Sequence, residues 1–164
     1  MRSPTTHTRW QGPDLLILRN DQEVDRLPAH DIRRVILVCR HGGQSPGDLS
    51  YAVIETTDHH VLLPADSGIA GRVHFERQAF WDQRPCIYWV DDAAVELPRR
   101  LRPGLRLFAR AAPPYTRLAH EELAPLLEQW PLEGPQTWEQ RKWERIMRSR
   151  HIGSPRSGLR PPPP

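Results

Sequence analysis

The chain has 164 residues and a formal net charge of +3 at pH 7, and 38% of its residues are hydrophobic. This length fits one domain of ordinary size with shorter appendages. No segment approaches the roughly 18 apolar residues of a membrane-spanning helix, and the first residues lack the apolar run of a secretory signal. We therefore expect a cytoplasmic protein without a membrane span.

The two cysteines, Cys39 and Cys86, lie far apart in the chain, each within an apolar run. Free cysteine is among the most buried residue types, whereas a disulfide framework uses more cysteines in a shorter chain. We therefore predict two buried, reduced thiols, in agreement with a cytoplasmic location.

The charge is divided unevenly along the chain. Residues 1–98 hold 10 Arg against 14 Asp and Glu, a net charge of −4, and residues 99–164 hold 13 Arg and Lys against 6 Glu, a net charge of +7. Lys142 is the only lysine beside 22 arginines. We interpret this preference for Arg first as the codon bias of a GC-rich, bacterial type of genome. Segments 99–117 and 145–160 contain no acid, and such blocks mark interaction surfaces or solvated tails.

Alternating apolar and polar residues predict a strand-rich first half after an irregular leader at 1–13. The β-branched residues of 31–40 favour a buried strand, and the few residues between 49–57 and 60–64 indicate a tight hairpin. The expected strands lie at 14–20, 22–28, 31–40, 49–57, 60–64, 86–90 and 93–98, with one more candidate at 101–111.

The hydrophobic period changes from that of a strand to that of a helix at Asp66. A helix is expected near 67–83, with Asp66 or Ser67 as its N-cap and Pro85 after its end. Two further helices are predicted at 120–130, where Pro125 removes a backbone donor, and at 136–150. The remaining Gly, Ser, Pro and Arg are typical of a disordered tail.

These elements predict an α+β fold. We expect a small antiparallel β barrel or a strongly bent sheet, with one helix near 67–83 and two C-terminal helices. The predicted divisions are an irregular leader at 1–13, a strand-rich domain at 14–111, a helical basic extension at 112–150 and a disordered Pro/Arg tail at 151–164.

Part of this pattern resembles bacterial pleckstrin-homology-like barrel proteins. The resemblance rests on Leu27-Pro28 followed by Asp31-Ile32 and Val35, and on the paired segments YAVIETT and HVLLP before a helix. It covers residues 14–82 and implies a PH-like barrel with a binding role, and it transfers no catalytic residue. In the usual barrel the helix comes last, whereas here strands are expected after it.

The adjacent histidines His59 and His60 raise the question of a metal site. Neighbouring residues of an extended chain point to opposite faces, and two zinc ligands fit better at i, i+2 on a strand or i, i+4 on a helix. The pair is therefore interpreted as part of a hairpin turn, and no metal or other cofactor is predicted. No phosphate-binding loop or nucleophile elbow is present, so no catalytic residue is predicted either.

The strongest functional signal is the segment 138–150, where aromatic residues and cations alternate. The candidate partner-binding residues are Trp138, Arg141, Lys142, Trp143, Arg145, Arg148 and Arg150. We predict a non-enzymatic protein-interaction module whose basic C-terminal extension contacts a protein partner. Because such a segment also suits phosphates and stacked bases, nucleic-acid binding is the alternative, and a small enzyme without a sequence-local motif is the second alternative.

Overall fold

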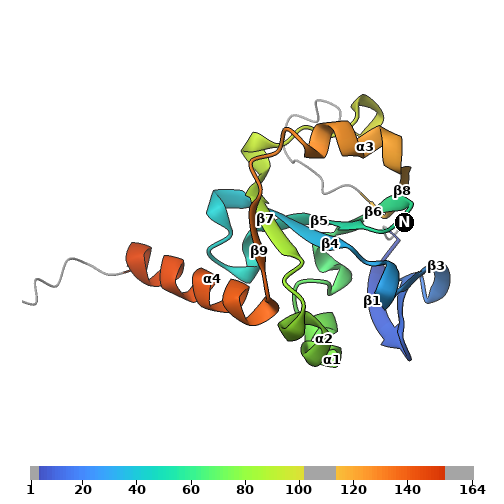
Figure 1. Cartoon of the computed structure of the whole chain (residues 1–164), viewed down its shortest axis with the longest axis horizontal. Helices are drawn as coiled ribbons and strands as arrows, with labels where there is room; N and C mark the ends of the chain where they lie inside the picture. Colours follow the sequence, from blue (N-terminus) through green and yellow to red (C-terminus); the bar gives the residue numbers. More distant parts are fainter. Residues whose placement is uncertain (1–3, 102–113, 154–164) are drawn as a thin grey trace, which may run out of the picture.

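The computed structural model describes residues 4–101 and 114–153, and these form an α+β fold (Figure 1). The described residues contain nine strands in two sheets, together with four α-helices. The sheets are mostly antiparallel and are not closed into a barrel. The α+β class is thus confirmed, while the sheets remain open.

The first sheet is built from three consecutive strands in the order β1-β2-β3: β1 (Thr6–Gln11), β2 (Asp14–Arg19) and β3 (Gln22–Pro28). Asn20 and Asp21 form the β2–β3 turn with φ of 51° and 64°, a region that Asn and Asp tolerate. The irregular leader predicted at 1–13 is therefore wrong over residues 6–11. That segment has few apolar residues, and it becomes a strand by pairing along β2.

The second sheet has six strands in the order β8-β6-β5-β4-β7-β9. They are β4 (Arg34–Cys39), β5 (Leu49–Glu55), β6 (His59–Pro64), β7 (Ile87–Asp91), β8 (Thr116–Ala119) and β9 (Glu133–Gln136). β4 and β7 pair in parallel, and all other neighbours are antiparallel. The segment 93–98, expected as a strand, is irregular after a short turn of 3-10 helix at Asp92–Ala94, and most of 101–111 lies outside the described residues.

Four helices pack around the sheets: α1 (Arg72–Glu76), α2 (Gln78–Gln83), α3 (His120–Leu127) and α4 (Trp138–Gly153). The single helix expected near 67–83 is divided at Arg77, whose φ of −134° and ψ of 37° interrupt the helical backbone. The two C-terminal helices are present as expected. Residues 151–153 of the predicted tail belong to α4, and 154–164 lie outside the described residues.

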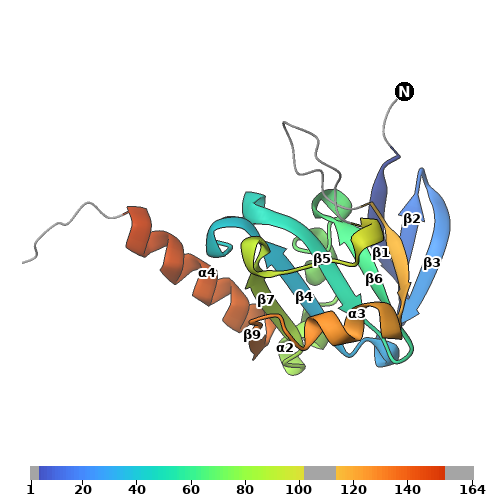
Figure 2. The ribbon, with the colours of Figure 1, turned by 90° about the horizontal axis from the view of Figure 1, so that it is seen from above.

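The helices lie on different sides of the six-stranded sheet (Figures 1 and 2). α3 covers one face, whereas α1, α2 and the three-stranded sheet lie on the other side. Two hydrophobic clusters fill these layers, one on each face of the sheet. α4 lies beside β9, and its C-terminal half projects away from the sheets.

The cysteine prediction is confirmed, because Cys39 and Cys86 are both buried and neither is in a disulfide. Burial raises the pKa of both thiols above the ordinary value. None of the helices in the described part of the chain is long and apolar enough to span a membrane.

Candidate functional site

Trp138, the first residue of α4, holds the start of this helix against the sheets. Its side chain is 7% exposed and belongs to the larger hydrophobic cluster. The indole stacks on the ring of His74, with centroids 3.8 Å apart and an interplanar angle of 16°, and His74 in turn meets the edge of Trp81. Trp138 was predicted as a partner-binding residue, but its side chain is buried in the hydrophobic core.

Arg141 lies one turn further along α4 and is 4% exposed. Its guanidinium carbon is 4.3 Å from the ring centroid of Trp89, and that of Arg148 is 3.6 Å from the same centroid. Arg141 forms no ion pair with any described carboxylate. Its Nε and Nη1 atoms have no hydrogen-bond partner among the described residues. Burial lowers the pKa of Arg141. Stacking on the indole and a hydrogen-bonded contact with the thiol of Cys39 are therefore the described interactions that offset its burial.

A glycine loop packs against the inner face of α4. Gly43 has a φ of 69°, and a Cβ there would lie 2.8 Å from Nη2 of Arg141 and 3.1 Å from Sγ of Cys39. A side chain at this position would therefore be strained by the left-handed backbone and would meet two buried groups. The loop that contains Gly42 and Gly43 therefore lies directly against α4.

The outer face of α4 carries apolar side chains that the fold leaves in water. Trp143 is 56% exposed and Met147, one turn later, is 50% exposed. Lys142 and Arg150 are exposed on the same helix. Neither cation forms an ion pair with a residue in the described part of the chain, so both charges are available to a binding partner.

A shallow groove of about 630 Å³ runs between α4 and β9, the outermost strand of the sheet. Its lining residues are Pro135, Gln136, Gln140, Trp143, Glu144, Met147 and Arg148. Arg148 crosses from the helix to the strand, where its Nη2 donates to Oε2 of Glu133 at 2.7 Å. The groove therefore has an apolar wall on α4 and an ion pair that fixes the helix to β9.

The seven predicted residues are thus divided between two faces of one helix. Trp138, Arg141 and Arg148 make intramolecular contacts with the aromatic rings of the fold. Arg145 is half-buried, and Lys142, Trp143 and Arg150 are exposed. Sequence reasoning missed Met147 and β9 as parts of this surface. The i, i+4 spacing of Met147 from Trp143 could have predicted that the two side chains lie together. No pattern in the sequence indicates that β9 pairs with β7.

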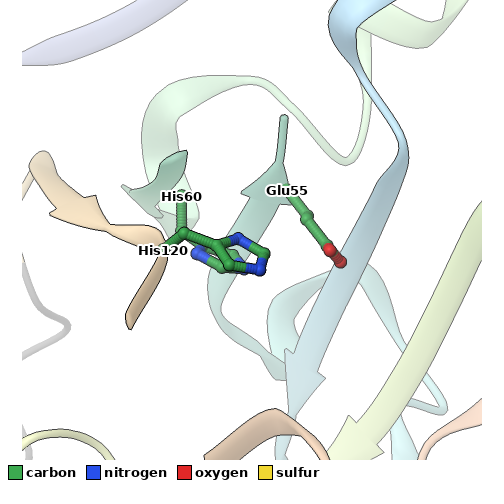
Figure 3. A group of neighbouring side chains, drawn as sticks. All are labelled: Glu55, His60 and His120. Atoms are coloured by element: carbon green, nitrogen blue, oxygen red, sulfur yellow. The ribbon is translucent and has the colours of Figure 1, made fainter. Parts of the chain in front are cut away.

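The histidine pair lies in the predicted hairpin, although both residues are in strand β6 and the bend is at Thr57 and Asp58. Nδ1 of His59 is 2.8 Å from Oδ1 of Asp58 and 2.9 Å from Oγ1 of Thr56. His60 is fully buried on the opposite face of the sheet, beside Glu55 and His120 (Figure 3). The two histidines therefore have unrelated surroundings, as alternation predicts.

The neighbouring acidic residues Asp91 and Asp92 have structural contacts at the end of β7. Oδ1 of Asp91 accepts a hydrogen bond from the backbone N–H of Ala93, and Oδ2 of Asp92 accepts one from the hydroxyl of Ser50. These contacts hold both side chains at the point where β7 ends.

The chain was compared with protein families, curated proteins and solved structures. No family model matches it, and no curated protein or solved structure is significantly similar to it.

Proposed function

We propose that this chain is a cytoplasmic, non-enzymatic protein-interaction module and that its docking surface is the outer face of α4 with the adjoining groove. The observation that carries the proposal is the exposure of Trp143. The inner face of α4 is already held by Trp138 and Arg141, so the fold gains little from Trp143. Tryptophan in such a position is the residue type that most often dominates a protein interface.

The partner that suits this surface is a protein segment with an apolar anchor and acidic neighbours. Trp143 and Met147 offer adjoining apolar surface, and a polarisable Met side chain adapts to partners of different shape. The exposed cations Lys142 and Arg150 add positive charge to the same helix, Lys142 on the side of Trp138 and Arg141. Acidic groups on the partner would be attracted by them, which increases the association rate more than the affinity.

The resemblance to PH-like barrels supports the same proposal, since it implies binding and transfers no catalytic group. It concerns residues 14–82, which form β2 to β6 and the helices that follow. The open sheets differ from a closed barrel. In this proposal the strand-rich region is a rigid support, and the C-terminal helix carries the binding residues.

Protein binding is favoured over nucleic-acid binding by the distribution of charge on α4. The cations Arg141 and Arg148 stack on Trp89, so the helix presents fewer free cations than its sequence indicates. Glu139 and Glu144 are exposed among the remaining cations, and carboxylates repel a phosphate backbone. A continuous basic stripe is therefore absent from the described part of α4.

The experiment is a capture assay in which purified full-length chain is compared with the double variant Trp143→Ala/Met147→Ser. We expect the variant to lose at least one protein that the unchanged chain captures, and direct titration of that protein should show about tenfold or more weaker binding. Phe75, which is 70% exposed on α1, supplies the matched control. Phe75→Ala removes an even more exposed aromatic side chain elsewhere and should leave the same partner bound.

Point variants are preferable to deletion of the extension. Deletion after residue 130 would remove Trp138 and Arg141 and uncover Trp89, so that a loss of binding would also follow from damage to the core. If Trp143→Ala/Met147→Ser and Phe75→Ala both capture the same proteins as the unchanged chain, the proposal is wrong. If the chain instead shifts DNA or RNA, with a steep weakening by salt that Lys142→Glu/Arg150→Glu abolishes, nucleic-acid binding replaces it.

A further inference from the structure

Three side chains able to bind a metal ion meet on the α3 side of the six-stranded sheet: Glu55, His60 and His120 (Figure 3). One ligand atom of each residue lies within 4.8 Å of those of the other two. Glu55 and His60 are directly opposite each other on β5 and β6, and His120 is the first residue of α3. Strand register and the position of the helix start therefore bring the three residues together.

The histidines of this cluster lack the hydrogen bonds that buried polar groups normally form. His60 is 0% exposed, and neither of its ring nitrogens has a partner among the residues described. Nδ1 of His120 is also buried and without a described partner. The two rings are stacked, with centroids 5.0 Å apart and an angle of 16°. Because buried polar atoms are nearly always paired, these nitrogens are open to a ligand that the described residues do not supply.

We propose that Glu55, His60 and His120 bind one divalent transition-metal ion of the zinc type. Two imidazoles and one carboxylate are a donor set that zinc takes in proteins, with its fourth position left for water or a ligand. Imidazole nitrogen also favours zinc and its neighbours in the first transition row over magnesium or calcium, which prefer oxygen.

The ion pair between Arg34 and Glu55 is compatible with this site. Nε of Arg34 donates to Oε2 of Glu55, and the two residues are opposite each other on β4 and β5. An ionised carboxylate has two oxygens and about four lone-pair positions. One oxygen can therefore bind the metal while the other keeps the arginine, which orients the ligand from the second coordination shell.

The ligands have to approach one another slightly when the ion binds. Tetrahedral zinc with ligands about 2.1 Å away separates its ligand atoms by about 3.4 Å, so atoms that lie within 4.8 Å of one another have to approach by up to about 1.4 Å. Glu55 and His60 are held by the ladder of the sheet. His120 is only half-buried at the start of a helix, so its side chain has room to turn out of the stack with His60 and direct a ring nitrogen at the ion.

The test uses full-length chain that has been treated with a chelator and then titrated with Zn²⁺ in competition with a chromophoric chelator. We expect one tightly bound ion per chain. His120→Ala should weaken binding about tenfold or more, and His60→Leu, which replaces a buried imidazole by an apolar side chain, should do the same. Co²⁺ should give the visible absorption of a tetrahedral site in the unchanged chain and lose it in both variants.

His59→Ala is the matched control, because His59 is adjacent in sequence but lies on the other face of the sheet and should leave zinc affinity unchanged. Zn²⁺ should raise the melting temperature of the unchanged chain and of His59→Ala, and not that of His120→Ala. Zinc binding that survives in His120→Ala, or that is lost in His59→Ala, overturns the site. If His60→Leu does not fold, the half-buried position 120 decides alone.

Discussion

The inner and outer faces of α4 have nearly the same residue types and opposite surroundings. On the inner face, Trp138 and Arg141 are buried against aromatic rings of the fold. On the outer face, Trp143 is mostly exposed, and Arg150 has no partner among the described residues. An alternation of tryptophan and cations is thus not one signal, because the residues on one side of the helix pack against the fold and those on the other side stay exposed.

This difference teaches that an arginine can contribute to packing before it contributes charge. The guanidinium groups of Arg141 and Arg148 lie over the indole of Trp89, a buried side chain of β7. Planar guanidinium stacks on aromatic rings more readily than an ammonium group does. Substitutions on the inner face should therefore reduce stability, and substitutions on the outer face should reduce binding alone.

The largest effect is expected at Trp138 on the inner face. Trp138→Ala removes a buried indole that stacks on His74, and truncation of a buried tryptophan costs about 3–5 kcal/mol of unfolding free energy. Urea denaturation followed by circular dichroism measures the loss. A change below about 1 kcal/mol would show that α4 is not held by this residue, and the division of the helix into two faces would then be wrong.

The second effect is a loss of stability in acid, which originates at His74 in the same stack. Burial lowers the pKa of His74 to about 3, so the folded chain keeps it neutral while the unfolded chain binds a proton below about pH 6.5. This contribution to stability is complete above pH 6.5 and is lost as the pH falls toward 3. Between pH 7 and pH 5 the expected loss is about 2 kcal/mol.

Denaturation curves at pH 7, 6 and 5 measure this acid dependence. His74→Phe keeps an aromatic ring against Trp138 and should remove the share of the slope that one proton causes. His30→Ala, which changes a histidine whose side chain is 80% exposed, is the control variant. An equal slope in all three proteins would exclude His74 as its origin.

A smaller effect is expected in the loop that packs against the inner face. Gly43→Ala places a Cβ beside Arg141 and Cys39 on a backbone with positive φ, and such strain costs about 1–2 kcal/mol. The comparison is Gly12→Ala, where φ is 56° but no atom lies within 4 Å of the new Cβ. The difference in unfolding free energy between the two variants measures the contact with α4 separately from the backbone strain.

The smallest effect on stability is expected on the outer face. Trp143→Ala should change the unfolding free energy by less than about 0.5 kcal/mol, because the side chain is already mostly in water. The same denaturation experiment as for Trp138→Ala gives a direct contrast between the two tryptophans. A loss of more than about 2 kcal/mol would make Trp143 structural and would remove the basis of the proposed docking surface.

Local pattern in the sequence was sufficient for most of the elements. The strands β2 to β7 lie where alternation and β-branched runs predict them, and the change of period at Asp66 marks the start of the segment that contains α1 and α2. The buried thiols of Cys39 and Cys86 also followed from residue type. These features depend on neighbours within a few residues, so residue type and spacing were sufficient to predict them.

The elements and sites that depend on distant partners became visible in the folded chain alone. β1, β8 and β9 have weak patterns of their own and exist through pairing with β2, β6 and β7. His60 and His120 are sixty positions apart and meet because β6 and β8 are neighbours. Arg141 and Trp89 are also far apart in the sequence, and they meet only because α4 packs against the sheet. Periodicity predicts that a side chain points inward. Strand order and register decide which group it meets there, and no local pattern in the sequence contains that information.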